Sequence, residues 1–173
     1  MSPRTLAVAS GAAFIACILA ANYVTTEYGM VPVGFGVVAT AGTYFAGLCF
    51  VLRDAVQDTA GKRSVLALIV VGALASYLVS DPFIALASGV AFLVSEVCDL
   101  LVYTPLRRRG YLRAALASNV VGALIDTVLF LWIAGFPIAD AIAGQMVGKL
   151  LVTLAVVLAV GGVRVVSRQP VRV

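Results

Sequence analysis

The chain has 173 residues, of which 62% are hydrophobic and 12% charged, with a net charge of +4 and a mean hydropathy of +1.10. Soluble domains average about 45–50% apolar and about 25% charged residues, so this composition excludes an ordinary soluble protein and indicates an integral membrane protein. The positive residues flank apolar stretches, which is typical of lipid contact and not of nucleic-acid binding. The chain lacks histidine, and its three cysteines, Cys17, Cys49 and Cys98, lie apart within apolar stretches. We therefore expect no metal site, no cofactor and no nucleic-acid partner.

Six stretches approach the roughly 20 apolar residues that a helix needs to cross the hydrocarbon core. In chain order they are 5–26, 34–53, 64–81, 83–105, 112–135 and 137–162. Turn-forming residues separate them, notably Pro32, Gly34, Asp81-Pro82, Pro105 and Gly135-Phe136-Pro137. The first stretch lacks a clean A-x-A cleavage site, so we expect a helix there and not a signal peptide. Because backbone groups in lipid must be satisfied internally, we expect one all-α, six-helix transmembrane domain spanning 1–173.

Eleven positive residues lie near the ends of the predicted spans or outside them, and all of them fall on one side of this arrangement. They are Arg4, Arg53, Lys62, Arg63, Arg107, Arg108, Arg109, Arg113, Arg164, Arg168 and Arg172. The loops of the other side carry Glu27, Asp81 and Asp140 and no positive residue. Because positive loops stay in the cytoplasm, we expect both termini to be cytoplasmic in a multi-pass protein of the cell inner (plasma) membrane. The remaining cation, Lys149, lies alone in the middle of the last span.

Polar residues occur near the middle of several predicted spans, where a charge facing lipid costs at least about 2.5–3.5 kcal/mol. They are Asn22 in the first span, Glu96 and Asp99 in the fourth, Asn119 and Asp126 in the fifth, and Gln145 and Lys149 in the sixth. Helical spacing puts Phe92, Glu96 and Asp99 on one face of the fourth span, and Asn119, Asp126 and Phe130 on one face of the fifth. These faces are expected to point inward, toward one another or toward water. Three acids against one lysine require further positive charge from a proton, a cationic ligand group or a loop arginine.

A purely structural role is the alternative for these residues. Lys149 could pair with Asp126 or with Glu96 and simply hold two spans together, and Asp99 could pair with Arg107 or Arg108 near the interface. A stabilising ion pair does not require so many polar groups at one depth, so we interpret the set as a substrate-binding site. An enzyme is not expected. The polar stretch 53–63 lacks the metal-binding signature of CDP-alcohol phosphotransferases, and the chain has no G-x-S-x-G or H-E-x-x-H motif.

With these residues in place, the chain resembles the VUT family, the YhhQ-like transporters of queuosine precursors. The matching segments are Ala21-Asn22-Tyr23, Asp54 with Gly61-Lys62-Arg63, Ser76 to Ser80, Ile84 to Ser88, Glu96-Val97-Cys98-Asp99, Leu106-Arg107-Arg108, Ala117 to Gly122, Asp126-Thr127 with Phe130, Ile133-Ala134 and Lys149. The resemblance covers nearly the whole chain, and the run through the fourth and fifth spans is its most specific part. It implies import of 7-deazaguanines such as preQ0 or preQ1, and a fold similar to the substrate-binding subunits of energy-coupling-factor transporters.

The polar residues suit such a ligand. A deazaguanine presents N1–H and a 2-amino group as parallel donors, which a carboxylate of Glu96 or Asp126 can accept together. Its O6 requires a donor such as Lys149 or Asn119. Its ring requires an aromatic neighbour, for which Phe92, Tyr44 and Phe130 are candidates, and Asn22 would close the outer end of the site.

Two other functions remain alternatives at this point. The chain could be the substrate-binding subunit of an ATP-driven uptake system, docking its partner through Ala9, Ala13, Ala16 and Ala20, or it could be a non-transporting structural protein of the membrane. Besides the lipid bilayer and a small-molecule substrate, a homodimer is a further candidate assembly. The preferred deazaguanine and the driving force are left open by the sequence.

Overall fold

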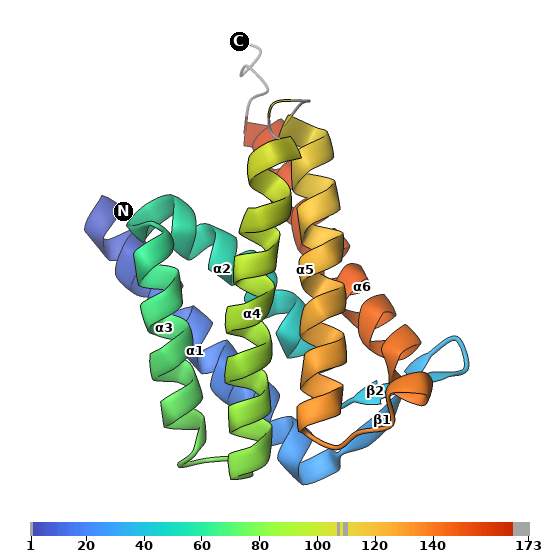
Figure 1. The fold of residues 1–173 in the computed structure, drawn as a ribbon. Coiled ribbons are helices and arrows are strands. Elements are labelled where there is room, and N and C mark those ends of the chain that lie inside the picture. The colour runs from blue at the N-terminus through green and yellow to red at the C-terminus, as the bar shows by residue number, and fades with distance from the viewer. Residues whose placement is uncertain (1, 107, 109–110, 168–173) are drawn as a thin grey trace.

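The computed structural model describes residues 2–106, 108 and 111–167. Within these residues the chain forms six α helices and one two-stranded hairpin (Figure 1). The elements are α1 (Pro3–Tyr28), β1 (Met30–Gly34), β2 (Val37–Thr40), α2 (Thr43–Ala60), α3 (Lys62–Ser76), α4 (Pro82–Leu106), α5 (Tyr111–Ile133) and α6 (Ile138–Ser167). Three helical segments of the described part are long and apolar enough to cross a membrane, Arg4–Tyr28, Pro82–Asp99 and Ile138–Val156, and Ala117–Ile133 is a shorter apolar helix. The chain is thus a predominantly helical membrane protein.

The segment after α1 differs from the prediction, because the first part of the expected span 34–53 is not helical. β1 and β2 pair as an antiparallel hairpin, with Met30 opposite Thr40. Phe35 and Gly36 at its tip have φ of 54° and 74°, and such left-handed pairs suit two-residue hairpin turns. The hairpin was missed because a short apolar run does not distinguish strand from helix, and because Pro32 argues against the interior of a strand.

The expected polar loop 53–63 is a second difference, since α2 continues through it to Ala60. Gly61 makes the turn between α2 and α3. Its φ of 82° favours glycine, and its N–H donates to the carbonyl of Gln57 at 2.9 Å. Arg53, which the sequence analysis counted as a loop residue, consequently lies inside α2 with 5% of its surface exposed. The interior therefore contains a second positive charge besides Lys149.

The predicted breaks at Asp81-Pro82 and at Gly135 fall where expected and have local causes, whereas Pro105 lies inside α4. Asp81 caps α4, because its Oδ1 accepts hydrogen bonds from the backbone N–H groups of Phe83 at 2.8 Å and Ile84 at 3.2 Å. Pro82 occupies the first turn of α4, where its missing N–H costs nothing. Gly135, with φ of 75°, follows the end of α5.

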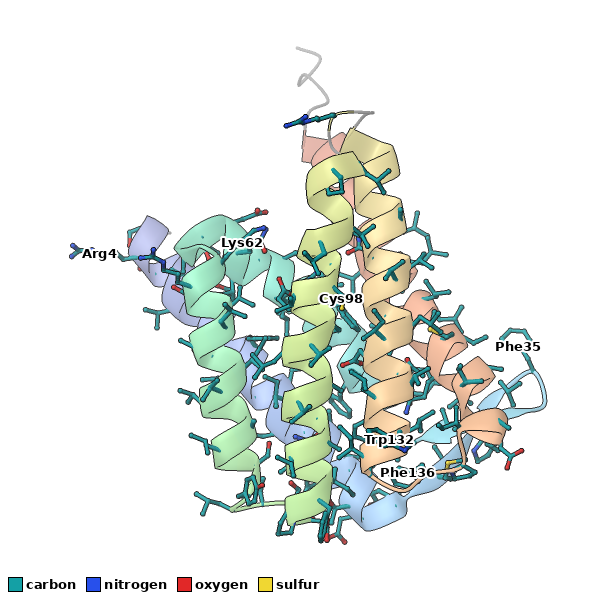
Figure 2. The ribbon with its side chains drawn as sticks, viewed as in Figure 1. Arg4, Phe35, Lys62, Cys98, Trp132 and Phe136 are labelled. Carbon is teal, nitrogen blue, oxygen red and sulfur yellow. The ribbon has the colours of Figure 1, made fainter. Side chains whose placement is uncertain are left out.

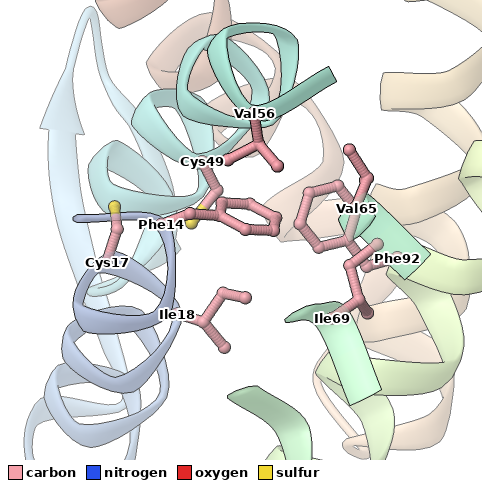
Figure 3. Packing of buried hydrophobic residues seen from close by; sticks show 8 residues of the cluster. All are labelled: Phe14, Cys17, Ile18, Cys49, Val56, Val65, Ile69 and Phe92. Atoms are coloured by element: carbon pink, nitrogen blue, oxygen red, sulfur yellow. The ribbon is translucent and has the colours of Figure 1, made fainter. Parts of the chain in front are cut away.

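The helices pack in two main groups around the middle of the molecule. α4 and α5 run side by side, and α2 packs against α1 and α6 (Figure 1). One hydrophobic cluster joins α1 to α4 and includes Phe14, Ile18, Val56, Ile69 and Phe92 (Figure 3). The three cysteines are free thiols, with Cys17 and Cys49 buried in this cluster and Cys98 half-buried. Cys17 and Cys49 therefore pack as small apolar side chains.

The connections lie at two opposite ends of the molecule. The start of α1, the α2–α3 turn, and the ends of α4 and α6 lie toward the end that is uppermost in Figure 1, and the α3–α4 and α5–α6 connections lie at the other. We call the uppermost end the basic end and the opposite end the hairpin end. Arg4 and Lys62 extend from the basic end, whereas Trp132 and Phe136 lie near the hairpin end (Figure 2).

Candidate substrate-binding site

A partly enclosed cavity of about 50 Å³ lies between the helices, smaller than the about 300–1,000 Å³ that is usual for small-molecule sites, so a ligand would require its lining side chains to move apart. All helices except α3 contribute to its wall, and so does β2. The lining residues are Ile18, Ala21, Asn22, Thr25, Thr40, Gly42, Ala46, Cys49, Phe50, Ser88, Phe92, Asp126, Phe130, Gln145 and Lys149. The cavity therefore brings together six of the residues that the sequence singled out: Asn22, Phe92, Asp126, Phe130, Gln145 and Lys149.

The central feature of the cavity is an ion pair between α5 and α6. The ammonium group of Lys149 donates to Asp126 Oδ2 at 2.7 Å and to Thr127 Oγ1 at 2.8 Å. Lys149 is 3% exposed and Asp126 9% exposed, so the pair lies away from lipid and bulk solvent. The sequence left Asp126 and Glu96 open as partners of Lys149, and in the structure Lys149 pairs with Asp126.

A close approach of α2 to α6 holds Lys149 in this position. A Cβ placed on Gly47 of α2 would lie 2.9 Å from the Cα of Lys149, a distance that real Cβ atoms essentially never show. Only glycine therefore lets α2 and α6 cross at this point. The crossing also sets Phe50 of α2 under the ammonium group, with Nζ 5.8 Å from the ring centroid.

Polar side chains near the hairpin end complete the cavity. Gln145 of α6 donates from Nε2 to Thr40 Oγ1 on β2 at 2.9 Å, so the hairpin supplies part of the wall. Asn22 of α1 donates from Nδ2 to Ser76 Oγ on α3 at 2.9 Å. Thr40 was not among the predicted residues, because the hairpin that carries it was not predicted.

Three phenylalanines give the cavity its flat apolar surfaces. Phe92 and Phe130 were predicted, and Phe50 was not. The rings of Phe50 and Phe92 meet edge to face, with centroids 5.4 Å apart and planes at 68°. Tyr44, the third candidate for ring stacking, is not among the lining residues and is 40% exposed, and its hydroxyl donates to the carbonyl of Val33 at 3.1 Å.

The predicted residues Glu96 and Asn119 do not line the cavity. They belong to a second polar cluster, one turn or more closer to the basic end, whose centre is Arg53. The guanidinium of Arg53 donates to Glu96 Oε2, contacts Asp54 Oδ1 at 2.9 Å and lies 3.5 Å from Asn119 Oδ1. Arg53 thus provides a second positive charge for the three interior acids and pairs with Glu96, whereas Asp99 has no cationic partner among the described residues. The sequence had a signal for Arg53, since an arginine at the edge of an apolar stretch can lie inside a longer helix.

Asp99, the remaining predicted residue, also lies outside the cavity. It is half-buried on α4, and its Oδ1 has no hydrogen-bond partner among the residues that the structure describes. No ion pair joins Asp99 to Arg108 within the same part of the chain, and Arg107 lies outside the described residues. The single binding face expected from helical spacing therefore divides into two polar clusters at different depths.

Comparison with known proteins supplies the family. The model of the family described as "Putative vitamin uptake transporter" (Vut_1) matches residues 73–163, which is more than half of the chain. No curated protein and no solved structure matches. The matched segment contains Phe92, Asp126, Gln145 and Lys149, and therefore the ion pair of the cavity. The chain belongs to the VUT family of membrane uptake transporters.

Proposed function

We propose that this transporter imports queuosine precursors, 7-deazaguanines such as preQ0 and preQ1, and that they bind in the cavity. The observation that carries the proposal is the Asp126–Lys149 pair on the cavity wall, with aromatic rings beside it. A deazaguanine offers two parallel N–H donors to a carboxylate and an O6 acceptor to a cation. One acid and one ammonium group at hydrogen-bonding distance are therefore complementary to its polar edge.

Binding would exchange partners within this pair. Asp126 would accept N1–H and the 2-amino group of the ligand, while Lys149 would turn toward O6 and keep its hydrogen bond to Thr127. Of the two carboxylates that the sequence left open, Asp126 is the better candidate, because Glu96 is paired with Arg53 outside the cavity. Lys149 is likewise preferred over Asn119 as the donor to O6.

The remaining lining residues suit the other parts of the ligand. Phe92 and Phe130 provide apolar ring surfaces for a flat heterocycle, and Gln145 and Asn22 lie where the ligand would enter from the hairpin end. A buried polar site of this kind discriminates strongly, because an analogue that lacks one polar group leaves a protein group unpaired. We therefore expect guanine-like edges to be required for binding.

The orientation of the chain in the membrane is inferred from the charge distribution. Arg4, Lys62 and Arg63 are exposed at the basic end, whereas Glu27, Asp81 and Asp140 are exposed elsewhere. By the positive-inside rule, the basic end and both termini are inferred to be cytoplasmic, in the cell inner membrane. A cysteine introduced in place of Arg4 should then react with a membrane-impermeant maleimide from the cytoplasmic face alone.

Calorimetry on the detergent-purified protein tests the proposed substrate. We expect saturable binding of preQ0 or preQ1, and loss of that binding in Lys149→Ala. Asp140→Asn is the matched control, since Asp140 is an exposed acid of α6 outside the cavity and its replacement should leave the affinity unchanged. Absence of binding to any deazaguanine by the unmodified protein would refute the proposed substrate and favour a non-transporting role.

An ATP-driven uptake system is the second candidate, and one observation favours it. On α1, Ala9, Ala13 and Ala16 are exposed and Ala20 is half-buried, so this face is free for a partner subunit in the described structure. Uptake by proteoliposomes that contain the purified chain and no ATPase would rule this candidate out. Binding without any uptake in the same liposomes would support it.

A further inference from the structure

The second polar cluster has no role in the proposed binding site, yet it lies directly between the cavity and the basic end. Arg53 follows the cavity residue Phe50 by three positions on α2, and Glu96 follows the cavity residue Phe92 by four positions on α4. Both steps lead toward the α2–α3 turn and the end of α4. A ligand that leaves the cavity toward the basic end would therefore have to pass the Arg53–Glu96 ion pair.

The barrier has two layers. The first is the edge-to-face pair of the cavity residues Phe50 and Phe92, which lie about one turn from Arg53 and Glu96 on their helices. The second is the ion pair, with the guanidinium of Arg53 5.7 Å from the Phe50 ring centroid. The Phe50 ring is thus within about 6 Å of two cations, the cavity residue Lys149 and Arg53 of the second polar cluster. An aromatic layer backed by a charged layer excludes both water and solutes.

The barrier joins two helices through side chains that can separate. α2 packs its backbone against α1 and α6, and α4 packs along α5, so Arg53–Glu96 and Phe50–Phe92 bridge two different groups of helices. Rotamer changes or a small shift of α2 would open them without unpacking either group. Arg53 would keep Asp54 as a partner when Glu96 is released, because both residues are on α2 and move together.

We propose that the Arg53–Glu96 ion pair, with the Phe50–Phe92 pair on its cavity side, is the gate that closes the cavity toward the basic end and opens to release substrate. This assignment rests on the proposed transport function but not on the identity of the substrate. It predicts that weakening the ion pair makes the cavity reachable from the basic end and leaves its access from the hairpin end unchanged.

Cys49 is a built-in reporter for this gate, because it is a buried thiol that lines the cavity from α2. With Cys17 and Cys98 replaced by alanine, membrane-impermeant maleimide labelling of Cys49 would be measured in vesicles of each orientation. We expect Glu96→Gln to raise the labelling rate from the basic end by about tenfold or more, as suits the loss of a buried charged hydrogen bond. Arg53→Lys, which keeps the charge but loses the fork of donors, should raise the rate in the same direction.

Two further variants make the test specific. Asp54→Asn removes the exposed partner of Arg53 without touching the link to α4, so Cys49 should stay protected. Exchanging the charges, Arg53→Glu with Glu96→Arg, should restore protection. The gate assignment is overturned if Glu96→Gln and Arg53→Lys label no faster than the parent, or if labelling rises equally from both ends. Calorimetry on the parent protein reports on the proposed substrate separately, so failure of one proposal is distinguishable from failure of the other.

Discussion

Two buried ion pairs cross helix interfaces in the described part of this protein, and they differ in what lies beside them. Lys149–Asp126 faces a cavity, whereas Arg53–Glu96 lies behind the Phe50 ring and does not. Burial does not separate the two pairs, since every one of these residues is at most 9% exposed. Both pairs keep costly charges away from lipid, and they differ in their position relative to the cavity. On that difference rests our proposal that one pair binds a ligand and the other closes the path to it.

Replacing Lys149 is expected to have the largest effect. In Lys149→Met we expect ligand binding to be lost and the free energy of unfolding to fall by about 3–5 kcal/mol, because Asp126 is left as an unpaired buried charge. Calorimetry and denaturant unfolding in detergent measure the two effects. Adding Asp126→Leu should recover stability without recovering binding. Recovery of both would mean that the pair is purely structural.

Neutralising one acid of each pair tests whether only the Lys149–Asp126 pair contributes to ligand affinity. Asp126→Asn should weaken deazaguanine binding by about 10- to 100-fold, as suits the loss of a charged hydrogen bond. Glu96→Gln should leave that affinity close to the parent value, because Glu96 is not a lining residue. Titration of both variants with the same ligand measures the difference. Equal losses of affinity would place Glu96 in the binding site and remove the distinction.

The close crossing of α2 and α6 offers a test of how Lys149 is positioned. Gly47→Ala should lower the free energy of unfolding by about 1–3 kcal/mol, because the added methyl group meets the backbone of Lys149. Gly122→Ala is the matched control, since the nearest atom to its added Cβ would be 3.6 Å away, an ordinary contact. Similar unfolding curves for the two variants would contradict a tight crossing at Gly47.

The smallest expected effect concerns the exposed partner of Arg53. Asp54→Asn should change the free energy of unfolding by less than about 1 kcal/mol, because ion pairs with a solvent-exposed member contribute little. Glu96→Gln, measured beside it, should cost more. A larger effect of Asp54→Asn would mean that Asp54, not Glu96, holds the guanidinium in place.

Sequence patterns predicted most of the helices and the burial of Asp126 and Lys149, because a lipid environment restricts the secondary structure and the placement of charges. Long apolar runs indicated six helices, and residues such as Asp81 and Gly135 marked connections that the structure confirms. Polar residues within apolar stretches indicated an interior site, because a charge facing lipid is too costly. The same reasoning placed Asp126 and Lys149 on inward faces, and the structure joins them in one ion pair.

Tertiary structure alone decided how those residues are divided. Helical spacing gives the face of a residue but not the neighbour that it meets, so Glu96 and Asn119 were assigned to the same site as Asp126. The true extent of α2, which carries Arg53 into the interior, depended on packing against α1 and α6 and not on hydropathy. The hairpin that brings Thr40 to Gln145 likewise depends on contacts with α6. Local hydrophobicity therefore determined that the chain is a largely helical membrane protein with charges in its interior, whereas distances between helices decided which charges line the cavity and which lie outside it.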